Sequence, residues 1–147
     1  MDKINGVRVI AGGLLAGVVI NVCEYVVKGV LLKERWAATM NAWGRSAEFN
    51  SIQMASFIVW GFLIGLFAVW MYAAIRPRYG AGPHTAVVAA LAVWALGYLA
   101  NAIPTISMQV FPRRLLAYGL AAGLVEVVVG TVLGAWLYKE TGSSGSA

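Results

Sequence analysis

The stretch GGLLAGVVINVCEYVVKGVLL, residues 12 to 32, has enough consecutive apolar residues to cross a lipid bilayer as a helix. It also contains Asn21, Glu24 and Lys28, whose amide, carboxylate and amine are each costly to place in hydrocarbon. Three polar side chains inside a membrane-spanning segment need either a structural or a functional explanation.

The rest of the chain has the composition of a membrane protein. Of its 147 residues, 61% are hydrophobic and 12% are charged, whereas a soluble domain usually has about 25% charged residues. Four apolar segments reach the roughly 20 residues that a transmembrane helix needs, and they cover residues 7–32, 54–75, 85–105 and 115–138. The sequence predicts an all-α membrane protein, an antiparallel four-helix transmembrane bundle that forms a single domain over residues 1–140.

The segment between the first two spans predicts a further, amphipathic helix. Trp36, Met40 and Trp43 follow one another at helical spacing, with basic and polar residues on the other faces. A helix of this kind lies in the membrane interface with its tryptophans at head-group depth. The alternative is a simple loop that carries aromatic residues. The Gly- and Ser-rich residues 141–147 are interpreted as a flexible tail or a remnant of expression.

The basic residues are divided almost evenly between the two ends of the predicted bundle. The end with the chain termini has five and the opposite end has six: Lys3, Arg8, Arg76, Arg78 and Lys139 against Lys28, Lys33, Arg35, Arg45, Arg113 and Arg114. Orientation in a membrane follows an asymmetry of such charges, so we predict weakly specified orientation or insertion in both directions. Basic residues at helix ends meet lipid head groups, and the chain has no nucleic-acid-binding motif. The expected partner is therefore the lipid bilayer and not nucleic acid.

The polar residues of the first span share one helical face. Gly13, Gly17, Asn21, Glu24 and Lys28 follow at spacings of three or four residues. The Gly13-x-x-x-Gly17 pattern allows another helix to approach closely. Glu24 and Lys28 have the favourable order for an ion pair, and Lys28 is able to reach the interface and neutralise Glu24. This ion pair is the structural alternative to a functional site.

Glu126 falls near the centre of the last span. A carboxyl group at the bilayer midplane costs about 2.5–3.5 kcal/mol on insertion scales, so it must be protonated, paired with another helix or hydrated. Gly119, Gly123, Gly130 and Gly134 lie on the same helical face. We therefore expect this face to pack closely against a neighbouring helix.

The two middle spans add further polar and small residues. The second span has a Gly61-x-x-x-Gly65 packing face, and the third carries Tyr98 and Asn101 on one face. We expect a polar, ionisable site in the bundle core, and its candidate residues are Glu24, Glu126, Asn21, Asn101 and Tyr98. Ionisable residues inside a membrane are by default assigned to binding or transport.

Three functions are compatible with such a site. The first is the binding or passage of a proton, a small cation or an amphipathic solute. The second is a structural or accessory subunit whose glycine faces dock partner helices, and the third is an enzyme that modifies lipid. We expect a homodimer. We expect no metal or cofactor, because the chain has one histidine, His84, and one cysteine, Cys23, and no cluster with the spacing of metal ligands.

Three segments resemble those of an uncharacterised group of bacterial four-helix membrane proteins. They are INVCEYVVKGVLL, YAAIRPRYGAGPHTA and GLVEVVVGTVLGAWLYKE, and the resemblance extends from the first span to Glu140. It implies a location in the bacterial inner membrane. It implies no particular activity, so the functional expectation comes from the residues.

Overall fold

The structure is a computed structural model that describes residues 4–138, and within this range it contains helices and no strand. Four helical spans are long and apolar enough to cross a membrane: Gly6–Leu31, Ser51–Tyr79, Pro83–Ser107 and Arg113–Leu137. The prediction of an all-α four-helix membrane bundle is confirmed, and the chain is a multi-pass membrane protein. Lys3, Lys139 and the predicted tail lie outside the described residues.

Two of the four spans change from α-helix to π-helix along their length. The first span consists of α1 (Gly6–Glu24) and the π-helical η1 (Tyr25–Leu31). The third consists of α4 (Pro83–Trp94), the π-helical η2 (Ala95–Leu99) and α5 (Ala100–Ser107). The remaining helices are α2 (Lys33–Ala42), which follows the first span, and the two uninterrupted spans α3 (Ser51–Tyr79) and α6 (Arg113–Leu137).

Capping and turn residues set where the helices begin and end. The Asn5 side chain caps α1, and Asn50 and Gln53 form a reciprocal capping box at the start of α3. The tight turn from α3 to α4 contains Gly80 at φ +83° and Gly82 at φ +137°. Glycine adopts such left-handed conformations without the steric cost that a Cβ adds.

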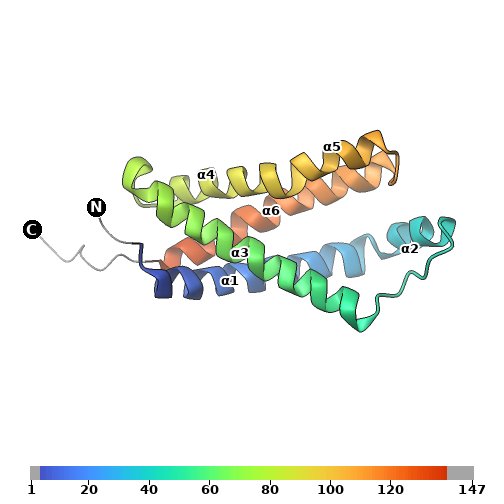
Figure 1. The fold of residues 1–147 in the computed structure, drawn as a ribbon, viewed down its shortest axis with the longest axis horizontal. Helices are drawn as coiled ribbons and strands as arrows, with labels where there is room; N and C mark the ends of the chain where they lie inside the picture. The colour runs from blue at the N-terminus through green and yellow to red at the C-terminus, as the bar shows by residue number, and fades with distance from the viewer. Residues whose placement is uncertain (1–3, 139–147) are drawn as a thin grey trace, which may run out of the picture.

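Consecutive spans are antiparallel neighbours, as their arrangement along the chain predicts (Figure 1). α1 packs against α3 and α6, and α4 packs against the same two helices from the other side. The N–H of Asn5 donates to the hydroxyl of Tyr138 at 3.3 Å. The start of α1 and the end of α6 therefore meet at one end of the bundle, which we call the terminal end. The opposite end, with residues 32–50 and 108–112, is the loop-1 end.

Glycines bring the backbone of α1 close to both of its neighbours. A Cβ on Gly65 of α3 would lie 2.7 Å from the Gly13 carbonyl oxygen and 2.8 Å from Gly17 Cα. A Cβ on Gly134 of α6 would lie 2.5 Å from the Gly12 carbonyl oxygen. Because these distances leave no room for a side chain, small residues at these crossings allow the helices to pack.

The buried core fills the half of the bundle nearer the terminal end. One cluster of buried side chains includes Val9 and Tyr72, and the next along the bundle includes Ile20 and Val127. No residue of η1 or η2, both of which the structure describes in full, is buried. Figure 1 shows the first span and α3 diverging from α5 and α6 toward the loop-1 end.

The segment after the first span forms the predicted helix. α2 extends past the end of η1 at the loop-1 end of the molecule (Figure 1). Its tryptophans pack on the turn between α5 and α6: the ring centroids of Trp36 and Trp43 lie 5.5 and 4.9 Å from that of Phe111. Packing between aromatic side chains thus determines where α2 lies.

Candidate functional site

The central feature of the bundle is the carboxyl group of Glu126 in the middle of α6. Its side chain is 1% exposed and is one of the largest that are fully buried. The hydroxyl of Tyr98, in η2, donates a hydrogen bond to Glu126 Oε1 at 2.8 Å. A carboxyl group at the bilayer midplane must be protonated, paired with another helix or hydrated. The structure shows that Glu126 is paired with a neighbouring helix.

Two features of the neighbouring helices place Tyr98 on Glu126. A Cβ on Gly123 would lie 2.6 Å from Tyr98 Cδ1, so the glycine makes room for the tyrosine ring against α6. One turn before Tyr98, Trp94 Nε1 donates to the carbonyl oxygen of Leu120 at 3.0 Å. Together these contacts hold the third span against α6 at the depth of the buried carboxyl group.

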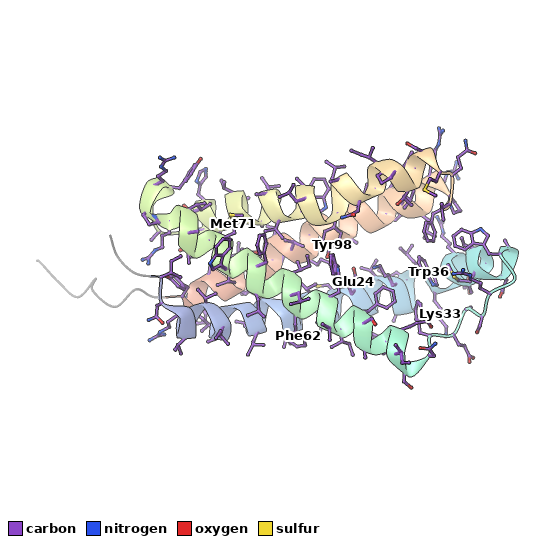
Figure 2. The ribbon with its side chains drawn as sticks, in the orientation of Figure 1. Glu24, Lys33, Trp36, Phe62, Met71 and Tyr98 are labelled. Atoms are coloured by element: carbon purple, nitrogen blue, oxygen red, sulfur yellow. The ribbon has the colours of Figure 1, made fainter. Side chains whose placement is uncertain are left out.

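A second carboxyl group, that of Glu24, reaches the same place from α1. Glu24 lies within hydrogen-bonding reach of the carboxyl group of Glu126. Its Oε2 is also 2.6 Å from the Nζ of Lys28, one turn further along the chain. Figure 2 shows Glu24 and Tyr98 at the same level of the bundle, between the diverging pairs of helices. The three groups around Glu126 therefore come from the first and third spans.

The helix packing of α1 explains why Glu24 arrives there. Antiparallel contacts between α1 and α6 run from Gly12 opposite Gly134 to Ala16, whose carbonyl oxygen would lie 3.0 Å from a Cβ on Gly130. The same register places Ile20 opposite Glu126 and Glu24 one helical turn further along. Because helix side chains tilt toward the N-terminus, that of Glu24 points back toward Glu126.

Both spans that deliver a side chain to Glu126 are π-helical at this level. The π-helical segment η1 begins directly after Glu24, and the N–H of Leu32 donates to the carbonyl oxygen of Val27 at 2.8 Å, five residues back. Tyr98 lies within η2. Short π-helical segments are frequent at functional sites, because they rotate side chains out of the ordinary α-helical register.

The charges of this site do not cancel when every group is ionised. Two ionised carboxylates this close together repel each other, and Lys28 compensates only one of them. A single proton, or one monovalent cation, makes the group neutral, which the interior of a membrane favours. A hydrogen bond between Glu24 and Glu126 itself requires a proton on one carboxyl group.

The exposure of the ionisable side chains decreases from the loop-1 end toward Glu126. The side chains of Lys28 and Glu24 are 39% and 25% exposed, whereas Glu126 is 1% exposed. On the other side of the carboxyl pair, the buried cores close the bundle toward the terminal end. The ionisable side chains thus become less exposed from Lys28 through Glu24 to Glu126.

The structure does not bring the two predicted asparagines into this site. Asn21 Nδ2 donates to the carbonyl oxygens of Gly17, at 2.8 Å, and of Ile58 on α3, at 3.2 Å, so its amide joins two helices. Asn101 is exposed, and its Nδ2 donates to the Gly97 carbonyl oxygen of its own span at 2.8 Å. Both amides satisfy backbone carbonyl groups and lie apart from Glu126.

The predicted packing glycines also differ in what they contact. A Cβ on Gly61 would lie 2.6 Å from Asn21 Nδ2, so this glycine accommodates the asparagine side chain. Gly119 has no described atom within 4 Å of the place where its Cβ would be. Sequence reasoning missed Gly12, which contacts α6, although the small pair Gly12-x-x-x-Ala16 is a recognisable signal for helix packing.

Comparison with models of protein families, with curated proteins and with solved structures finds no match to this chain.

Proposed function

We propose that this protein binds a proton or a small monovalent cation at the Glu24–Glu126 pair and passes it through the membrane. The observation that carries the proposal is that a buried carboxyl group, held by Tyr98, has a second carboxyl group beside it. Helix pairing alone does not need a second carboxyl group, because like charges repel. A site that takes up and releases one positive charge does need an excess of one negative charge.

Each side chain then has a distinct role. Glu126 holds the proton or cation at the centre of the membrane, and the Tyr98 hydroxyl orients its carboxyl group. Glu24 transfers the proton or cation between Glu126 and the loop-1 end, because its own side chain is partly exposed. Lys28 balances the remaining negative charge. An amphipathic amine would also supply the single positive charge.

The alternative of a structural or accessory subunit has less support. It relied on glycine faces that dock helices of other proteins, but Gly13, Gly17, Gly65 and Gly134 contact helices within the chain itself. The resemblance noted above favours a bacterial inner membrane as the location. A homodimer stays a prediction.

The test measures proton flux in liposomes that contain the purified protein, with a pH-sensitive dye inside and an imposed membrane potential. Glu126→Gln keeps the size of the side chain and can still accept from Tyr98, but it cannot ionise. The matched control is Glu34→Gln, which removes an exposed carboxyl group of α2. We expect the control to conduct as wild type does and Glu126→Gln to lose the flux.

Infrared spectroscopy gives a second measurement that does not depend on flux. A protonated carboxyl group has its own carbonyl stretching band, and we expect one titrating band of the wild type to be retained in Glu34→Gln and lost in Glu126→Gln. Parallel sodium flux measurements distinguish a proton from a metal cation. If Glu126→Gln equals wild type in proton flux, sodium flux and the infrared titration, the proposal is wrong.

A further inference from the structure

A groove of about 610 Å³ lies at the loop-1 end, between α2 and the turn that joins α5 to α6. Trp43 and Phe111 form an aromatic wall, with ring centroids 4.9 Å apart. Thr39, Gln109 and Arg113 contribute polar groups to the lining. The volume is within the range of ligand sites, about 300–1,000 Å³.

The groove is in a positively charged part of the surface. Arg113 is exposed and forms no ion pair within residues 4–138. The surface of the loop-1 end carries five basic and two acidic residues: Lys33, Arg35, Arg45, Arg113 and Arg114 against Glu34 and Glu48. An anionic ligand would complement this charge.

The groove also lies at a defined depth in the membrane. α5 ends at Ser107 and α6 begins at Arg113, and both helices belong to membrane-spanning segments, so the groove lies where hydrocarbon gives way to head groups. Ile106 and Val110 add an apolar part to its lining. Gln109 has a φ of +53°, an uncommon conformation for a residue other than glycine, and such residues cluster at ligand sites.

We propose that this groove binds the head group of an anionic phospholipid. The phosphate contacts the guanidinium group of Arg113, and the glycerol and upper acyl chains lie against the aromatic wall and Ile106. A phospholipid presents a negative charge and hydrocarbon together at this depth, which a water-soluble anion does not. The site is separate from the carboxyl pair, and it does not depend on the function proposed above.

Native mass spectrometry of the full chain in detergent tests the proposal, with phosphatidylglycerol and phosphatidylcholine of identical acyl chains added in turn. Arg113→Gln removes the charge, and Ala42→Trp fills the groove without changing any charge. The matched controls are Arg45→Gln, at the same end but outside the lining, and Arg78→Gln, at the other end. Circular dichroism of each variant confirms that the helices are retained.

We expect wild type and both controls to retain phosphatidylglycerol in preference to phosphatidylcholine. Arg113→Gln should bind it about fivefold more weakly, the effect of one basic residue near a head group, and Ala42→Trp should abolish the preference. The proposal is overturned if Arg113→Gln and Ala42→Trp both behave as the controls do. It is also overturned if the two lipids bind equally, or if millimolar inorganic phosphate displaces phosphatidylglycerol, which would indicate a site for a soluble anion.

Discussion

The hydroxyl of Tyr98 is the hydrogen-bond donor that satisfies Glu126 where the bundle excludes solvent. An unpaired polar group in such a place costs more than the net value of the hydrogen bond that it loses. The tyrosine ring has a separate role, because it fills the space that Gly123 leaves on α6. Removing the hydroxyl alone therefore separates the hydrogen bond from the packing.

We expect Tyr98→Phe to destabilise the protein by about 1–3 kcal/mol, the cost of leaving a buried polar group without its hydrogen-bond partner, and to shift the infrared band of the Glu126 carboxyl group. Thermal unfolding in detergent and infrared spectroscopy measure the two effects. Tyr79→Phe, which removes an exposed hydroxyl from the end of α3, is the control. Identical unfolding and infrared spectra for the two variants would show that the hydroxyl does not hold Glu126 in place.

At the scale of the helices, two glycines of similar sequence context differ sharply in their surroundings. Gly65 lies where α3 crosses the backbone of α1, and Gly119 has open space within the described part of the chain. Gly65→Ala should destabilise the bundle by about 1–3 kcal/mol through overpacking. Gly119→Ala should be neutral or stabilising by up to about 1 kcal/mol, since alanine favours helix.

Urea-induced unfolding in mixed micelles, followed by circular dichroism, would compare the two alanine variants. The same substitution in both makes their difference independent of helix propensity. If Gly119→Ala is as destabilising as Gly65→Ala, then Gly119 contacts a helix that the single chain does not provide. That result would restore the hypothesis of a docking face for another subunit.

The sequence predicted the helices well and the composition of the site only in part. The four spans follow from hydropathy, which depends on composition and not on register. The expected common face of Tyr98 and Asn101 assumed α-helical geometry throughout, but η2 rotates the residues after it. Hydropathy does not reveal such a change. Asn101 consequently lies on the exposed side of the span.

Asn21 illustrates a different limit. It shares a helical stripe with Glu24, but α1 lies between α3 and α6, so one stripe faces two neighbours. The amide contacts α3, where Gly61 leaves room, and the carboxyl group one turn later reaches α6. The pattern of one helix does not specify which neighbour each residue contacts. That depends on how the helices cross.

For the molecule as a whole, the two ends differ in shape more than in charge. The terminal end is filled by buried side chains, whereas Lys28 and Glu24, toward the loop-1 end, are partly exposed. Five basic residues at the first and six at the second leave almost no difference for the positive-inside rule. The face of the membrane on which the carboxyl pair is accessible is therefore weakly determined by the charges.

We therefore predict that two substitutions determine the orientation. Arg8→Ala with Arg78→Ala leaves three basic residues at the terminal end against six, which should retain the loop-1 end in the cytoplasm. Lys33→Ala with Arg45→Ala leaves five basic residues at the terminal end against four at the loop-1 end, which should retain the terminal end in the cytoplasm. All four side chains are exposed, so the bundle should be unaffected.

Reporter enzymes fused after Glu140 should be active on opposite sides of the membrane for the two pairs of substitutions, with wild type showing intermediate activity on each side. An unchanged, single orientation in wild type and in both variants would mean that another feature, such as the aromatic cluster of the loop-1 end, directs insertion.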